Sequence, residues 1–181
     1  MPPLALFVLP PVLAWSCASD LLYRRISNQL VFILLLLWLL EQAFALALGP
    51  ATSAVVLGQA ARALPGALAV LVVGFGLFRL NRVGAGDVKL AAVLCLWVGA
   101  AQQTTFLIVT SLAGGLLALL LPLLGVFEQL LARFWWQAVQ WLPVRYRQLP
   151  QCLGEASRPG IPYALALCIG VLFTLFVPLS A

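Results

Sequence analysis

Two aspartates are the residues best suited to do chemistry: Asp87, in the polar stretch 82–89, and Asp20, far upstream. The chain has five acidic residues and no histidine, so the commonest general base and metal ligand is missing. Two carboxylates that approach closely cannot both ionise cheaply, so one keeps its proton at a raised pKa while the other acts as a base. Such a pair can activate water against an amide bond, and it needs neither a metal ion nor a cofactor. We therefore expect neither.

The residues around Asp87 are suited to shaping such a site. Gly84 and Gly86 permit tight turns and the close approach of a substrate strand. Lys89, the only lysine, points to a different face from Asp87 if the preceding turn leads directly into a helix. Two roles are open for its ammonium: attraction of an acidic group on a substrate, or contact with lipid phosphate.

Each aspartate also has a purely structural interpretation. Asp20 is four residues before Arg24, a spacing at which the two side chains pair on a helix. Asp87 could cap the helix that follows it and balance the charge of Lys89. Polarity alone does not separate these roles from catalysis, because carboxylates at a membrane interface are much cheaper than central ones.

The composition is that of an integral membrane protein. Hydrophobic residues make up 64% of the 181 positions and charged residues 8%, and the mean hydropathy is +1.11. The apolar residues run right round successive predicted helices, as contact with lipid requires. At roughly 20 residues per crossing, this length allows a single domain of about six transmembrane helices. The predicted fold is therefore an all-α transmembrane domain covering residues 1–181.

The apolar runs give the expected crossings: 3–19, 30–48, a third ending at 78, 90–101, 106–126 and 161–179. The fourth run is short unless its helix begins near Asp87, which would place that carboxylate at a helix N-terminus. Residues 127–160 mix aromatic and basic side chains. This mixture suits a helix lying in the headgroup layer on the cytoplasmic side, or equally a long solvent loop with aromatic anchors.

The basic residues predict the orientation in the membrane. With six crossings, nine of the ten lysines and arginines fall on one side and only Arg62 on the other. The positive-inside rule makes the first side cytoplasmic and places both termini outside. Asp20 and Asp87 then lie at the same cytoplasmic face. The basic residues mark the ends of apolar runs and do not gather on a soluble face, so we expect no nucleic-acid partner.

The four cysteines are separated in the sequence and form no C-x-x-C pair. Three of them lie within apolar runs: they are Cys17, Cys95 and Cys168, with Cys152 the fourth. Isolated cysteines of this kind are typical of small packing residues. We expect neither a disulfide framework nor a metal site from them.

Two segments carry a family resemblance. Asp20 with Arg24-Arg25-Ile26-Ser27-Asn28, and then Gly84-Ala85-Gly86-Asp87-Val88-Lys89-Leu90, resemble the two signatures of the bacterial type IV prepilin peptidases, the G-x-G-D membrane aspartyl proteases. Pro162-Tyr163-Ala164 is similar to a third, weaker feature. Ser27 stands where the family usually has proline. The resemblance extends over essentially the whole chain.

The resemblance implies a function and a set of site residues. Asp20 and Asp87 would be the catalytic pair, and the residues implied to bind substrate or shape the site are Gly84, Gly86, Lys89, Arg24, Arg25, Asn28 and Pro162. The substrates would be prepilins or pseudopilins, cut at the cytoplasmic face of the inner membrane just before their hydrophobic helix. Membrane lipids would be the other partners of this multi-pass protein.

The resemblance is to the short branch of the family. Larger members carry a cytoplasmic cysteine-rich insert and methylate the new N-terminus, and nothing here matches that insert. The chain resembles the peptidase-only form of tight-adherence (Flp-type) pilus systems, so N-methylation is not expected. The competing functions are an ion- or proton-coupled transporter subunit and a non-enzymatic assembly component. The matched broken helices that point to a transporter are absent from the sequence.

Overall fold

The computed structural model describes residues 5–23, 26–49, 52–120 and 163–177, with a few single positions between 130 and 137. Its helices are α1 (Ala5–Tyr23), α2 (Asn28–Leu48), α3 (Ser53–Arg79), α4 (Ala85–Val98), α5 (Gln103–Leu119) and α7 (Tyr163–Phe176). Every regular element in these ranges is a helix, which confirms the all-α prediction.

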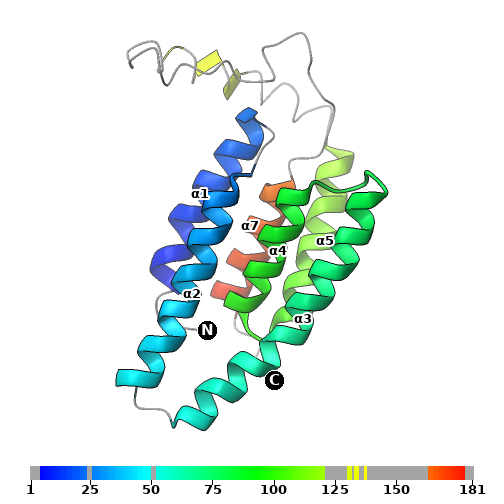
Figure 1. Ribbon diagram of the computed structural model, residues 1–181. Helices are drawn as coiled ribbons and strands as arrows, with labels where there is room; N and C mark the ends of the chain where they lie inside the picture. Colours follow the sequence, from blue (N-terminus) through cyan, green and yellow to red (C-terminus); the bar gives the residue numbers. More distant parts are fainter. Residues whose placement is uncertain are drawn as a thin grey trace.

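The helices form an elongated bundle in which they run roughly along one common axis (Figure 1). α1 ends, α2 begins, α3 ends, and α4 and α7 begin at the same end of this bundle, the upper end in Figure 1. We call it the site end. α1 begins and α7 ends at the opposite end, so the direction of the chain alternates as expected for successive crossings.

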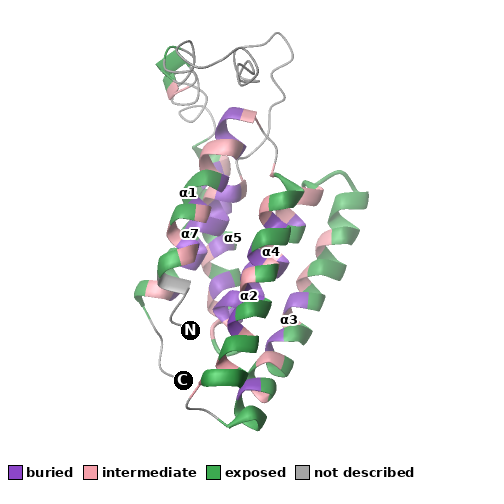
Figure 2. Cartoon of the chain, turned by 60° about the vertical axis from the view of Figure 1, so that its left-hand side comes forward, coloured by how far each residue is buried: buried purple, intermediate pink, exposed green. Residues whose placement is uncertain are grey.

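Two helices are long and apolar enough to cross a membrane by themselves: α2 with 21 residues and α3 with 27. Much of the surface of α3 is exposed in the isolated chain (green in Figure 2), including Val72, Val73 and Phe75. A large exposed apolar surface of this kind is suited to lipid. α1, α5 and α7 are apolar but shorter. The six crossings and the side on which the termini lie remain predictions.

α4 is the core of the bundle, and two tryptophans fix it to α2. Residues 92–98 of α4 are all buried. The Trp38 indole N–H donates to the carbonyl of Leu96, and the Trp97 indole N–H donates to the carbonyl of Leu34, each over 3.1 Å. A buried indole N–H needs such an acceptor. The reciprocal pair therefore sets the register of α2 against α4.

Gln103 joins three helices at the opposite end of α4. Its side-chain amide donates to the carbonyl of Ala63 in α3 over 2.8 Å and to that of Cys95 in α4 over 3.1 Å. A Cβ on Gly66 would overlap the Gln103 side chain. The glycine is therefore what lets the amide reach into the groove between α3 and α4.

The helix bounds differ from the expected runs where polar residues are taken into a helix. α1 continues to Tyr23, so Asp20 lies within its last turn and not in the connection that follows. α4 begins at Ala85 and not at residue 90, which places Asp87 in its first turn. Of residues 127–160, only a few positions are described, so the two alternatives for this segment, an interfacial helix or a solvent loop, lie outside the described residues.

Candidate active site

Asp20 is held at the site end by a contact between α1 and α7. Its side chain is 7% exposed, and its Oδ2 accepts a hydrogen bond of 3.0 Å from the backbone N–H of Ala164. Ala164 lies in the first turn of α7, where backbone N–H groups have no partner within the helix. Such N–H groups favour an anion. The start of α7 is therefore a fitting partner for a carboxylate.

Asp87 is positioned by the way α4 begins. Gly84 is the N-cap of the helix and Asp87 is the third residue after it. The carboxylate turns back to a backbone hydrogen bond with Gly84, as an acidic residue does at this position of a capping box. A Cβ on Gly84 would lie 2.7 Å from Oδ2 of Asp87. Glycine therefore leaves room for the carboxylate. The hydrogen bond with Gly84 is the helix-capping contact that a purely structural role of Asp87 predicts.

The pKa of Asp87 is far from its ordinary value. Asp87 lies in the first turn of α4, at the site end. It is outside α2 and α3, the two helices that are long enough to cross a membrane. Burial and, second, the negative charge of Asp20 raise the pKa of Asp87 from 3.8 to about 7, against the opposing effect of the bond with Gly84. The two carboxyl groups are thus within electrostatic reach of each other. At neutral pH the pair readily holds one proton.

The two sequence signatures also meet at two further points. Gly86 packs against the connection between α1 and α2, where an added Cβ would lie 3.0 Å from Cβ of Ile26. The Lys89 ammonium donates to Oδ1 of Asn28, the first residue of α2, over 3.1 Å. The N-terminus of α4 is therefore brought against the end of α1 and the start of α2.

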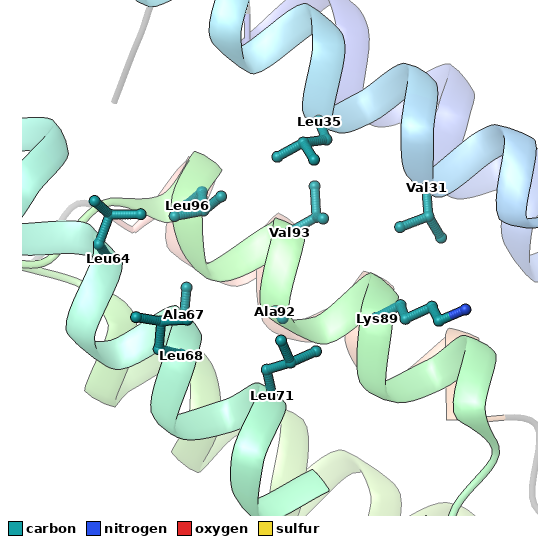
Figure 3. Close-up of a pocket in the computed structure, with 10 residues that line it drawn as sticks. All are labelled: Val31, Leu35, Leu64, Ala67, Leu68, Leu71, Lys89, Ala92, Val93 and Leu96. Atoms are coloured by element: carbon teal, nitrogen blue, oxygen red, sulfur yellow. The ribbon is translucent and has the colours of Figure 1, made fainter. Parts of the chain in front are cut away.

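Lys89 stands at the rim of an apolar groove and not beside Asp87. At 100° per residue, positions 87 and 89 are about 200° apart on α4. The groove has a volume of about 370 Å³, and Figure 3 shows the ammonium at one end of its apolar side chains. Its other lining residues come from α2, α3 and α4: Val31, Leu35, Leu64, Ala67, Leu68, Leu71, Ala92, Val93 and Leu96.

Three predicted site residues, Arg24, Arg25 and Pro162, lie outside the described residues. The proposed pairing of Asp20 with Arg24 lies there too. Among the described residues, no three His, Cys, Asp or Glu side chains form a group that could hold a metal ion.

Two features of the structure were not predicted from the sequence. One is the backbone N–H of Ala164 as the partner of Asp20. Only the weak resemblance at residues 162–164 pointed to that segment, because every residue type except proline has a backbone N–H and the sequence therefore does not show which one binds Asp20. The other is Glu41, a buried acid inside α2. An ionisable residue within an apolar run is itself a signal that could have drawn attention to it.

Comparison with known proteins identifies the family. Residues 7–119 match the model of the type IV leader peptidase family. That range is well over half of the chain and contains both aspartates, but it does not include α7. No match is found among curated proteins or among solved structures. The chain, an apolar helical protein with two carboxyl groups in electrostatic contact, belongs to the type IV leader peptidase family.

Proposed function

We propose that the chain is a membrane aspartyl endopeptidase that removes the leader peptide of type IV prepilins, with Asp20 and Asp87 as its catalytic pair. The family supports a peptidase of this type. The observation that carries the choice of residues is the packing of the N-terminus of α4, which holds Asp87, against the connection that follows Asp20. The raised pKa of Asp87, caused by burial and by the charge of Asp20, agrees with it. A carboxylate that only capped α4, far from other acids, would not have its pKa raised by the charge of a second carboxylate.

The two carboxyl groups take different roles in the proposed reaction. We assign the proton of the pair to Asp87, because its pKa of about 7 leaves much of it protonated near neutral pH and because the charged form of Asp20 is suited to the N–H of Ala164. Asp20 takes a proton from water, and the water oxygen bonds to the scissile carbonyl carbon while Asp87 donates to the carbonyl oxygen. The C–N bond then breaks as the proton held by Asp20 passes to the amide nitrogen, and Asp87 takes back its proton as the carbonyl group re-forms.

The substrate we propose is a prepilin or pseudopilin of the Flp type, cut at the cytoplasmic face of the inner membrane just before its apolar helix. The lack of a cysteine-rich insert supports the peptidase-only branch, without N-methylation. Asp87 and Lys89 lie on different faces of α4. A substrate that engages both therefore passes over the N-terminus of α4, where Gly84 and Gly86 carry no side chain.

The direct test uses the purified full chain in lipid nanodiscs. A synthetic peptide with a basic leader followed by an apolar helix is added together with the methyl donor S-adenosylmethionine, and the products are identified by mass spectrometry. We expect one cut immediately before the apolar segment and an unmodified new N-terminus. An intact peptide in the presence of folded protein would contradict the proposal, and proton or cation flux through liposomes would then favour a transporter. A methylated product would overturn the peptidase-only assignment.

A further inference from the structure

Two cysteines that are far apart in the sequence touch each other in the structure. Cys17 in α1 and Cys168 in α7 have their Sγ atoms 2.7 Å apart. The Cys168 thiol also lies 3.4 Å from the carbonyl of Leu13, and the Cys17 thiol 3.7 Å from that of Ala164. Both cysteines are free and pack in the hydrophobic core, as expected, and the structure in addition places them against each other.

The sulfur pair lies next to the contact that positions Asp20. Cys17 precedes Asp20 by three residues, and Cys168 follows Ala164 by four, so each thiol is about one helical turn from one partner of that contact. Both helices thus present a thiol at the same level, directly below the carboxylate and the N–H that binds it. Cys95 is buried in α4, and Cys152 lies outside the described residues.

We propose that Cys17 and Cys168 are a disulfide-forming pair, a modification site that covalently joins α1 to α7 beside Asp20. A disulfide has an S–S bond of about 2.03–2.05 Å. The two sulfur atoms need to approach by only about 0.7 Å from their present contact to form that bond. The N–H contact of Asp20 stays in place during so small a movement.

The reaction requires an oxidant, and a small-molecule disulfide supplies it. Cys17 is the more exposed thiol of the two and reacts first. Its thiolate attacks the added disulfide, forms a mixed disulfide and releases one small thiol. Cys168 then loses its proton, attacks Sγ of Cys17 and expels the second small thiol. Two electrons pass from the cysteine pair to the oxidant, which leaves as two thiols.

The bond is expected to depend on the redox state of its surroundings. With the predicted topology, both thiols lie towards the cytoplasmic side, where thiols are kept reduced. The pair is then open in growing cells and closes on oxidation. Closure links residues 151 positions apart, and cross-links that close long loops stabilise a protein most in the chain-entropy description.

The test oxidises the purified full chain with an excess of a small-molecule disulfide, blocks the remaining thiols with N-ethylmaleimide and maps the peptides by mass spectrometry. We expect a linked Cys17–Cys168 peptide that separates again with dithiothreitol. The unfolding midpoint should rise by about 5 °C or more. Cys17→Ser and Cys168→Ser should each lose both effects, whereas Cys95→Ala should keep them.

The peptide map of the wild-type chain tests the Cys17–Cys168 disulfide even if a variant fails to fold. Alkylation of both Cys17 and Cys168 after oxidation would overturn the proposal, as would a bridge that contains Cys95 or Cys152. A correct bridge with an unchanged midpoint would show that the bond does not join the two helices in their native arrangement. All of these readouts are independent of cleavage, so they leave the proposed peptidase activity to its own test.

Discussion

The two ends of α4 bury polar groups in opposite ways. Towards its C-terminus, each buried donor has a neutral acceptor: the indoles of Trp38 and Trp97 reach backbone carbonyls, and so does the amide of Gln103. Each of these bonds joins neutral groups, so none of them changes with protonation. Together they fix the arrangement of the helices.

At the N-terminus of α4, two acids lie within electrostatic reach of each other instead. Asp20 and Asp87 are both acceptors when ionised, and each has a backbone N–H from a helix start. Burial and, second, the charge of Asp20 raise the pKa of Asp87 to about 7, so a proton on Asp87 relieves both its desolvation and the repulsion between the two acids. The comparison teaches that buried polarity alone does not indicate function. A pair of like charges that needs a proton does.

The largest effect on cleavage is expected from removing either acid at the N-terminus of α4. Asp20→Asn and Asp87→Asn should each lower cleavage by about 100-fold or more, since each removes one half of the acid–base pair. The measurement is the rate of peptide cleavage, with folding checked by thermal unfolding. Glu41→Gln is the matched control, because it makes the same acid-to-amide change at a buried position of α2. Near-normal cleavage by either aspartate variant would defeat the catalytic pair.

The second prediction concerns pH. Because Asp87 must hold its proton, cleavage should fall as the pH rises through about 7. Stability follows the same group: the folded-state pKa is above the ordinary 3.8, so the protonated form favours folding. The contribution is full below 3.8 and is lost as the pH rises to about 7. Asp87→Asn should therefore gain stability over the wild type across that range, measured as unfolding midpoints in detergent. A constant difference would contradict the raised pKa.

A third prediction concerns the C-terminal end of α4, where a substitution should change the stability of the fold and leave the cleavage rate unchanged. Gly66→Ala should displace the Gln103 amide from the carbonyls of Ala63 and Cys95, because the added Cβ overlaps that side chain. We expect a loss of about 1–3 kcal/mol from buried groups left without partners, with the cleavage rate per folded molecule unchanged. Gly58→Ala is the control on the same helix, since a Cβ there has open space. Since alanine favours a helix more than glycine does, Gly58→Ala should keep or slightly raise stability, and equal losses in both variants would show that the amide contact is not responsible.

The sequence predicted most of the fold because lipid-facing helices are marked by composition alone. The second and third apolar runs match α2 and α3 within a few residues. The predictions were less accurate where a polar residue enters a helix. Asp20 was expected beyond α1, yet it lies in the last turn, because a backbone N–H of α7 compensates for its burial. A pattern within one segment cannot show a partner 144 residues away.

The same limit applies to the site. The motif around Asp87 and the glycines before it were apparent in the sequence, and the family match includes both aspartates. The pairing of Asp20 with Asp87 was expected from the resemblance, and in the structure the charge of Asp20 does act on Asp87. The bond from Lys89 to Asn28 and the sulfur pair were not predicted, because each joins residues of different helices that come together only when the helices pack.

The smallest effect on cleavage is expected from substitution of Lys89, and it tests whether this residue belongs to the site. The ammonium is exposed and bonded to Asn28, at the rim of an apolar groove and about 200° from Asp87 on α4. An exposed ion pair with a substrate carboxylate contributes only about 0.2–1 kcal/mol. If Lys89 attracts such a carboxylate, Lys89→Gln should weaken processing of a substrate with an acidic residue just inside its apolar helix. The variant should have little further effect once that residue is neutralised. Cleavage rates for all four combinations of enzyme and substrate give the coupling energy. Additive losses would instead assign the ammonium to lipid phosphate and leave the two aspartates as the whole of the charged site on α1 and α4.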